Sequence, residues 1–134
     1  MIGLVIVAHG GLARELLAAT EHVVGPQSGA VAVSTGPEDD LTAKQAEIDA
    51  AVGAVDSGDG VILVTDMFGG TPCNLAIGSM GGASVEVIYG ANLPMLVKIA
   101  KMRARPLDEA VAAAIEAGRK YIDAASRMLQ AKAV

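Results

Sequence analysis

Residues 60–66 read GVILVTD, a run of aliphatic and β-branched side chains that begins at a glycine and ends at an aspartate. A continuous apolar run of strand length, bounded by turn residues, is typical of a strand covered on both faces of a parallel sheet. We therefore expect residues 60–65 to form a central strand, with Asp66 just beyond its carboxyl end. Three more short β-branched segments occur in the chain, at residues 2–8, 30–34 and 84–89.

Longer segments with helical periodicity separate these strands. One face of the first helix carries apolar side chains at helical spacing: Leu12, Leu16, Ala19 and Val23. Gly25-Pro26 ends that helix, because neither residue continues it well. The acids at positions 38–40 suit the N-terminus of a second helix, where the helix dipole favours negative charge.

The second half of the chain repeats the pattern. A third helix begins near residues 72–74 and is followed by the Gly81-Gly82 turn and the fourth strand. Asn92 can cap the next helix, and Arg105-Pro106 separates it from a last helix that begins around residues 107–109. This alternation predicts a doubly wound α/β domain: a mainly parallel four-stranded sheet in the flavodoxin-like order 2-1-3-4, with helices on both faces.

Length and composition place the chain among small soluble proteins. Its 134 residues fit one domain, residues 1–134, and 52% of them are hydrophobic. The longest apolar runs are far shorter than the roughly 18 residues that a membrane span requires. The N-terminus shows no basic leader before its apolar run, so we expect a cytoplasmic protein with no direct membrane insertion.

Charge, aromatic content and cysteine usage exclude several classes. The net charge is −5 and aromatic residues make up only 2%, so the basic groove and stacking rings of nucleic-acid binders are missing. Cys73 is the only cysteine, which rules out an internal disulfide and a multi-thiolate metal site. We expect no bound metal and no cofactor, and we interpret Cys73 as a small buried hydrophobic residue.

His9 and Asp66 are the strongest candidates for chemistry. Ligands of doubly wound sheets bind outside the carboxyl ends of the strands, where the strand order reverses. In the order 2-1-3-4 the first and third strands are neighbours, so His9 and Asp66 should leave the sheet side by side. Gly10 and Gly11 leave the imidazole open to a bulky partner, and Asp66 could hold the hydrogen on one ring nitrogen while the other attacks phosphorus.

The segment Phe68-Gly69-Gly70-Thr71-Pro72 is a candidate phosphate-binding loop. It offers backbone N–H groups, the Thr71 hydroxyl and the N-terminus of the following helix, all of which favour an anion. Each of these signals also has a plain structural interpretation, since a histidine after a strand, an aspartate in a turn and a Gly-Gly pair are common. Their convergence at one edge of the predicted sheet favours the functional interpretation.

Three motifs resemble one known family. Residues 6–10 read IVAHG, residues 65–74 read TDMFGGTPCN and residues 90–96 read GANLPML. They resemble, in order and spacing over almost the whole chain, the enzyme IIA domain of the mannose family of the bacterial phosphoenolpyruvate-dependent sugar phosphotransferase system. The resemblance implies a phosphotransferase activity in which His9 is the phosphoryl acceptor and Asp66 orients it.

The resemblance also implies further site residues and partners. Thr71 matches a hydroxyl position near the phosphate, and the candidate phosphate-binding residues are Gly10, Gly69, Gly70, Thr71 and Asn92. The expected donor is the histidine-containing phosphocarrier protein, and the expected acceptor is a IIB component on a separate chain. A homodimer is implied as well, in which a C-terminal segment joins the partner's sheet as an antiparallel edge strand. Residues after Gly118 carry only a weak strand signal, so this exchange, the sugar and the choice between transport and regulation stay open.

Other functions of the same architecture require residues that the sequence lacks. The first strand is not followed by G-x-G-x-x-G or by G-K-[S/T], which excludes a nicotinamide-binding domain and a P-loop. A phospho-aspartate receiver would need paired acids there, and a histidine phosphatase would need Arg at Ala8. A small metal chelatase would need a second histidine, and only His22, near a helix end, is available. The alternative that stays open is a regulatory module whose His9 phosphorylation is a signal without transport.

Overall fold

The computed structural model of the protein describes residues 1–81 and 84–133, and the side chains up to residue 130. Its four strands are β1 (Gly3–His9), β2 (Ala30–Thr35), β3 (Val61–Thr65) and β4 (Val85–Tyr89). All pair in parallel in the order β2-β1-β3-β4, which confirms the predicted order. In this register Val7 lies opposite Thr65, so β1 and β3 reach the same edge of the sheet together.

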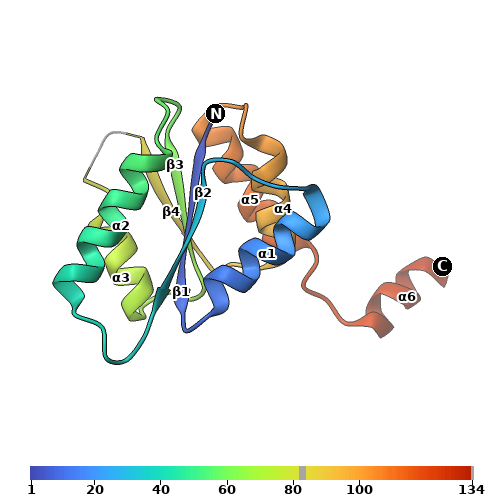
Figure 1. Cartoon of the computed structure of the whole chain (residues 1–134). Helices are drawn as coiled ribbons and strands as arrows, with labels where there is room; N and C mark the ends of the chain where they lie inside the picture. Colours follow the sequence, from blue (N-terminus) through green and yellow to red (C-terminus); the bar gives the residue numbers. More distant parts are fainter. Residues whose placement is uncertain (82–83, 134) are drawn as a thin grey trace.

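Helices cover both faces of the sheet (Figure 1). One face carries α1 (Leu12–Val24), α4 (Leu93–Met102) and α5 (Leu107–Lys120), and the other carries α2 (Leu41–Val55) and α3 (Thr71–Gly78). This two-sided cover is the arrangement that the apolar run at residues 60–65 predicts, and every residue of β3 is buried. Within the described residues, no helix is both long and apolar enough to cross a bilayer.

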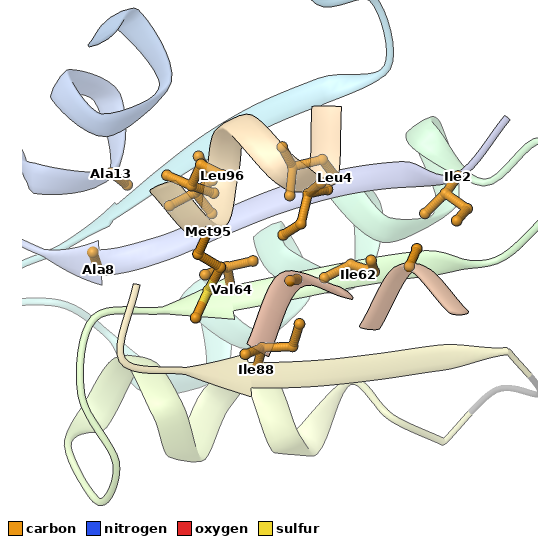
Figure 2. Packing of buried hydrophobic residues seen from close by; sticks show 13 residues of the cluster. Ile2, Leu4, Ala8, Ala13, Ile62, Val64, Ile88, Met95 and Leu96 are labelled. Atoms are coloured by element: carbon orange, nitrogen blue, oxygen red, sulfur yellow. The ribbon is translucent and has the colours of Figure 1, made fainter. Parts of the chain in front are cut away.

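Alternate residues of the central strands feed two separate cores. Leu4, Ile6 and Val64 pack toward α1, α4 and α5, where Met95 and Leu96 meet them (Figure 2). Neighbouring positions such as Val5, Val7 and Leu63 pack toward α2 and α3. Because successive side chains of a strand point to opposite faces, a shift of one residue in register would exchange the two cores. The register, and with it the position of His9, is therefore fixed by packing.

Element boundaries differ from the expected ones by a residue or two. β1 extends to His9, which pairs with Thr35 of β2 instead of following the strand. The acids expected at the N-terminus of α2 lie just before its first residue, and Asp40 is its N-cap, accepting from the N–H groups of Thr42 and Ala43. An aspartate at the N-cap satisfies N–H groups that have no partner within the helix. Gly82 of the expected Gly81-Gly82 turn lies outside the described residues.

The C-terminal region is helical. α5 runs through Gly118 to Lys120, and after a short connection α6 (Ala125–Ala133) stands apart from the sheet (Figure 1). The described residues after Gly118 thus contain helix and turn in this chain. Exchange of a strand with a second subunit stays a prediction.

Arg103, at the end of α4, ties together the amino ends of β1 and β2. Its guanidinium donates to the carbonyl oxygens of Ile2 (2.7 Å) and Gly29 (2.9 Å), and to the side-chain oxygen of Gln27 (3.1 Å). In return, the backbone N–H of Ile2 donates to the Arg103 carbonyl at 2.8 Å. The side chain is almost fully buried, with 4% of the residue exposed. A buried cation held by several neutral acceptors fixes this end of the sheet.

We expect Arg103→Met to lower the free energy of unfolding by about 3 kcal/mol, because it leaves buried carbonyl groups without their charged donor. Urea denaturation of the full chain measures this change. Arg105→Met is the matched control, since Arg105 is exposed and, among the described residues, its guanidinium pairs with the equally accessible Glu109; this substitution should change stability by no more than about 0.5 kcal/mol. Equal effects of the two substitutions would show that Arg103 does not stabilise this end of the sheet.

Candidate functional site

The candidate site lies at the carboxyl edge of the two central strands. His9 is the last residue of β1, and Asp66 directly follows β3, the strand paired with β1. The order of the strands therefore brings together two residues that lie 57 positions apart in the chain. This is the meeting of side chains that the sequence predicts for the switch point of a doubly wound sheet.

Asp66 binds His9 at two points. Its Oδ2 lies 2.7 Å from Nδ1 of the imidazole and accepts the backbone N–H of His9 at 3.1 Å. Its other oxygen accepts the backbone N–H of Met67, also at 3.1 Å. A carboxylate only accepts hydrogen bonds, so Nδ1 carries the hydrogen in this contact and Nε2 is left as the free nitrogen of the neutral ring.

The carboxyl group of Asp66 is held in its ionised form. Its partial burial raises the pKa, but the hydrogen bonds from the ring and backbone of His9, together with the attraction of that ring when it is protonated, outweigh burial. The pKa of Asp66 is therefore below its ordinary value. The two side chains differ in access, since 51% of the His9 side chain is exposed but only 12% of the Asp66 side chain. The imidazole of His9 is thus accessible from solvent, and the carboxylate of Asp66 that binds it is mostly buried.

Nε2 of His9 faces the start of α3. A Cβ atom added to Gly70 would lie 2.9 Å from Cε1 and 3.2 Å from Nε2 of the imidazole, both tighter than ordinary contacts. The absence of a side chain at Gly70 is therefore what lets the ring lie against this helix. Two nearby turns also use glycine, because Gly10 (φ +56°) and Gly69 (φ +88°) take the left-handed conformation that other residues avoid.

In the described part of the chain, three helices, α1, α3 and α5, begin without a side-chain cap, and α1 and α3 are the two that start beside His9. α1 and α3, which follow β1 and β3, have Gly11 and Gly70 as N-caps and no side-chain cap. α2 and α4, which follow the outer strands, are capped by the side chains of Asp40 and Asn92. The N–H groups at the start of α3, beside Nε2 and with the exposed Thr71 as its first residue, are thus free of a capping side chain. Such a helix end favours an anion.

Asn92 has a structural role in this chain. Its Oδ1 accepts the N–H of Met95 at 3.0 Å, which caps α4, and its Nδ2 donates to the carbonyl of Gly118 at 2.9 Å. Both ends of the amide are thus engaged in joining the loop after β4 to the end of α5. The structure does not bring this side chain into the His9–Asp66 pair.

His22 and Cys73 are expected to have structural roles. His22 is in the last turn of α1, a helix whose first residue is three positions after His9, so the two histidines belong to opposite ends of it. Cys73 is fully buried, as expected of a small hydrophobic residue. Among the described residues, no group of three or more His, Cys, Asp or Glu side chains is arranged to hold a metal ion.

An exposed apolar patch beside the site was not foreseen from the sequence. Phe68 and Tyr89 have ring centroids 4.9 Å apart at an interplanar angle of 53°, and more than half of each residue is exposed, as is also true of Met67. These residues follow or end β3 and β4, which pair with each other. The signal available in the sequence was the position of Phe68, an aromatic residue only two places after Asp66. Aromatic residues are enriched in binding surfaces.

Comparison with known proteins identifies the family. The family described as "EIIA-man: PTS system fructose IIA component" matches residues 3–116. The mannose/sorbose specific IIA subunit of the phosphotransferase system from Enterococcus faecalis is 32% identical, with a TM-score of 0.82 over 92% of this chain and 93% of that one. The phosphotransferase system component EIIA from Streptococcus agalactiae is 25% identical, with a TM-score of 0.85 over 95% and 99%. The chain belongs to the EIIA-man family of phosphotransferase system IIA components.

A longer relative matches over part of its length. The mannose-specific EIIAB component of the phosphotransferase system of Escherichia coli strain K12 is 33% identical over 126 residues. These residues make up 92% of this chain, and the chain spans 39% of the length of that protein.

We expect Gly70→Ala to displace the His9 ring, because the added methyl group would stand 2.9 Å from Cε1. The displacement should weaken the hydrogen bond from Nδ1 to Asp66. Nitrogen NMR of the neutral His9 ring measures this: the wild type should show the hydrogen on Nδ1, and the variant should show averaging of the two tautomers. Gly53→Ala is the control, since nothing lies near a Cβ at that helical position. An unchanged ring spectrum in Gly70→Ala would contradict the close packing.

Proposed function

We propose that this chain is a cytoplasmic phosphoryl carrier in which Nε2 of His9 accepts a phosphoryl group from the histidine-containing phosphocarrier protein and passes it to a IIB component, coupled to sugar uptake. The observation that carries the proposal is the 2.7 Å contact between Nδ1 of His9 and Asp66, with Nε2 left beside the start of α3. Asp66 binds Nδ1, and Nε2 is left accessible. A ring with one bound and one accessible nitrogen fits a nucleophile better than a structural histidine.

The proposed transfer moves one phosphoryl group between two imidazoles. The bond from phosphorus to the donor nitrogen breaks as the bond to Nε2 of His9 forms, and the donor ring, protonated on its other nitrogen, leaves as neutral imidazole. The hydrogen on Nδ1 of His9 stays in place, so the phosphorylated ring carries a positive charge. The carboxylate of Asp66 balances that charge and keeps the ring oriented. In the second transfer the bond from phosphorus to Nε2 of His9 breaks as a bond to the acceptor forms, and His9 returns to its neutral form.

The start of α3 is the proposed place for the phosphoryl oxygens. Gly70 lies against Nε2, and Gly69 and Thr71 flank it, so backbone N–H groups and the Thr71 hydroxyl are at hand for an anion. Gly10 turns the chain directly after His9 with a φ of +56°, and the space that a Cβ there would occupy is open. We assign phosphate binding to these four residues. Asn92 is the weakest of the candidates, because its amide already caps α4.

Protein partners fit the surroundings of the site. Met67, Phe68 and Tyr89 form an exposed apolar border next to an imidazole of which half is exposed. Donor and acceptor proteins must both approach Nε2 closely, and interface cores are enriched in such aromatic residues and methionine.

Phosphoenolpyruvate together with the upstream phosphotransferase proteins should label the wild-type chain with one acid-labile, alkali-stable phosphate. His9→Ala should abolish labelling, and Asp66→Asn should slow it by more than tenfold while the chain stays folded, because the carboxylate orients the ring but is not the acceptor. His22→Ala should label normally. Persistent labelling of His9→Ala would refute the proposal. Onward transfer to a IIB component is measured in the same assay, and its absence with every IIB tested would favour a purely regulatory role.

We also propose a homodimer. A groove of about 530 Å³ is lined by residues of the edge strand β4 and of α5, most of them apolar, together with the charged Glu86 and Arg119. The segment after α5 also presents large apolar side chains, since Ile122 and Leu129 are both more than 60% exposed. Light scattering should give twice the chain mass of 13.5 kDa, and Ile122→Glu should shift the protein toward monomer. Val23→Glu, at an exposed site on α1, is the control. A monomeric wild type would refute the dimer.

A further inference from the structure

Arg14 is a cation five positions after His9 in the chain, and it has no part in the proposed phosphoryl transfer. It lies in the first turn of α1, three positions after the N-cap of that helix. Its Nη2 atom is 3.3 Å from the position that a Cβ on Gly11 would occupy, so the guanidinium is folded back over the start of the helix. Gly11 is two residues beyond His9. Because Gly11 has no side chain, nothing at that position separates the guanidinium from the turn that follows His9.

The guanidinium of Arg14 is only weakly paired. Its ion-pair partner among the described residues is Glu15, at 3.8 Å from Nε, and about three quarters of each side chain is exposed. Exposed pairs of this geometry contribute little. Lys44 is the other Lys or Arg among residues 1–97, and it is engaged: its Nζ lies 2.7 Å from Glu47, and this carboxylate raises the pKa of Lys44. Arg14 is thus the available cation of this part of the chain.

A phosphorylated His9 would create a need for such a cation. A phosphoryl group carries between one and two negative charges near neutral pH, and Asp66 adds another on the opposite side of the same ring. The ring charge compensates only part of this. Arginine is well suited to a phosphoryl group, since its planar guanidinium donates two parallel hydrogen bonds to phosphate oxygens.

We propose that Arg14 turns from Gly11 toward the phosphoryl group on Nε2 of His9 and binds its oxygens. Arg14 then acts as a phosphate-binding residue that stabilises the phosphorylated form. The inference rests on the proposed phosphorylation of His9. In this arrangement α3 binds the phosphoryl group through its N-terminal N–H groups and α1 binds it through Arg14. The group is then bound from both sides of the ring.

The test compares Arg14→Gln and Arg14→Lys with the wild type in the full chain. Each is equilibrated with phosphoenolpyruvate, the upstream enzyme and a limiting amount of phosphocarrier protein, and the phosphorylated fraction is read on a phosphate-affinity gel. Arg14→Gln should lower the equilibrium constant for phosphorylation by about three- to fivefold, the size typical of an exposed charge pair. Arg14→Lys should lower it less, and raising the salt concentration should shrink the difference, because ions screen exposed charges.

Arg105→Gln is the matched control, because it removes the same charge from an exposed site at the end of α4 opposite to the N-cap Asn92, and it should leave the equilibrium constant unchanged. Thermal unfolding checks that all variants fold. An Arg14→Gln chain with the wild-type equilibrium constant, even if it reacted more slowly, would overturn the inference, since Arg14 would then act on the approach of the donor and not on the phosphorylated ring. A wild-type chain that is not labelled on His9 would instead refute the proposed function, and the inference with it.

Discussion

The pairing of β1 with β3 is the constraint on which the rest of the structure depends. Both strands are buried on both faces, and their alternate side chains fill two separate cores, so neither strand can slip by one residue without exchanging them. This register brings the ends of the two strands to the same edge, where His9 and Asp66 meet at 2.7 Å. The geometry of the candidate site is therefore a consequence of core packing and not of the loops that surround it.

The two ends of the sheet differ in their side chains and contacts. At the amino end, the buried guanidinium of Arg103 fastens the start of β1 and the segment before β2 to α4. At the carboxyl end, the chain uses glycine turns at Gly10 and Gly69 and leaves apolar side chains exposed. The contacts of Arg103 are thus separated by the length of a strand from the exposed groups around His9. Loops at the carboxyl edge are free to vary without disturbing the core.

The sequence predicts the fold through its strongest signals. The apolar run before Asp66 and the regular alternation of strands and helices were enough to place His9 beside Asp66. Contacts between residues far apart in the chain could not be predicted from the sequence. The amide of Asn92 could be assigned to helix capping, but its second bond, to the carbonyl of Gly118, joins residues 26 positions apart in the sequence. The Phe68–Tyr89 contact likewise exists only because β3 pairs with β4.

The missing side-chain caps on α1 and α3 have a thermodynamic consequence. Helix N-termini without a cap leave donors that water must satisfy, and these two ends flank the histidine while the outer helices are capped by Asp40 and Asn92. In the proposed phosphorylated form, the covalently attached anion would supply the acceptor that the start of α3 lacks. Anything that binds the native state alone stabilises it. Phosphorylation of His9 would then also stabilise the first turn of α3. The rate at which that turn opens to solvent would therefore differ between the phosphorylated and unphosphorylated forms.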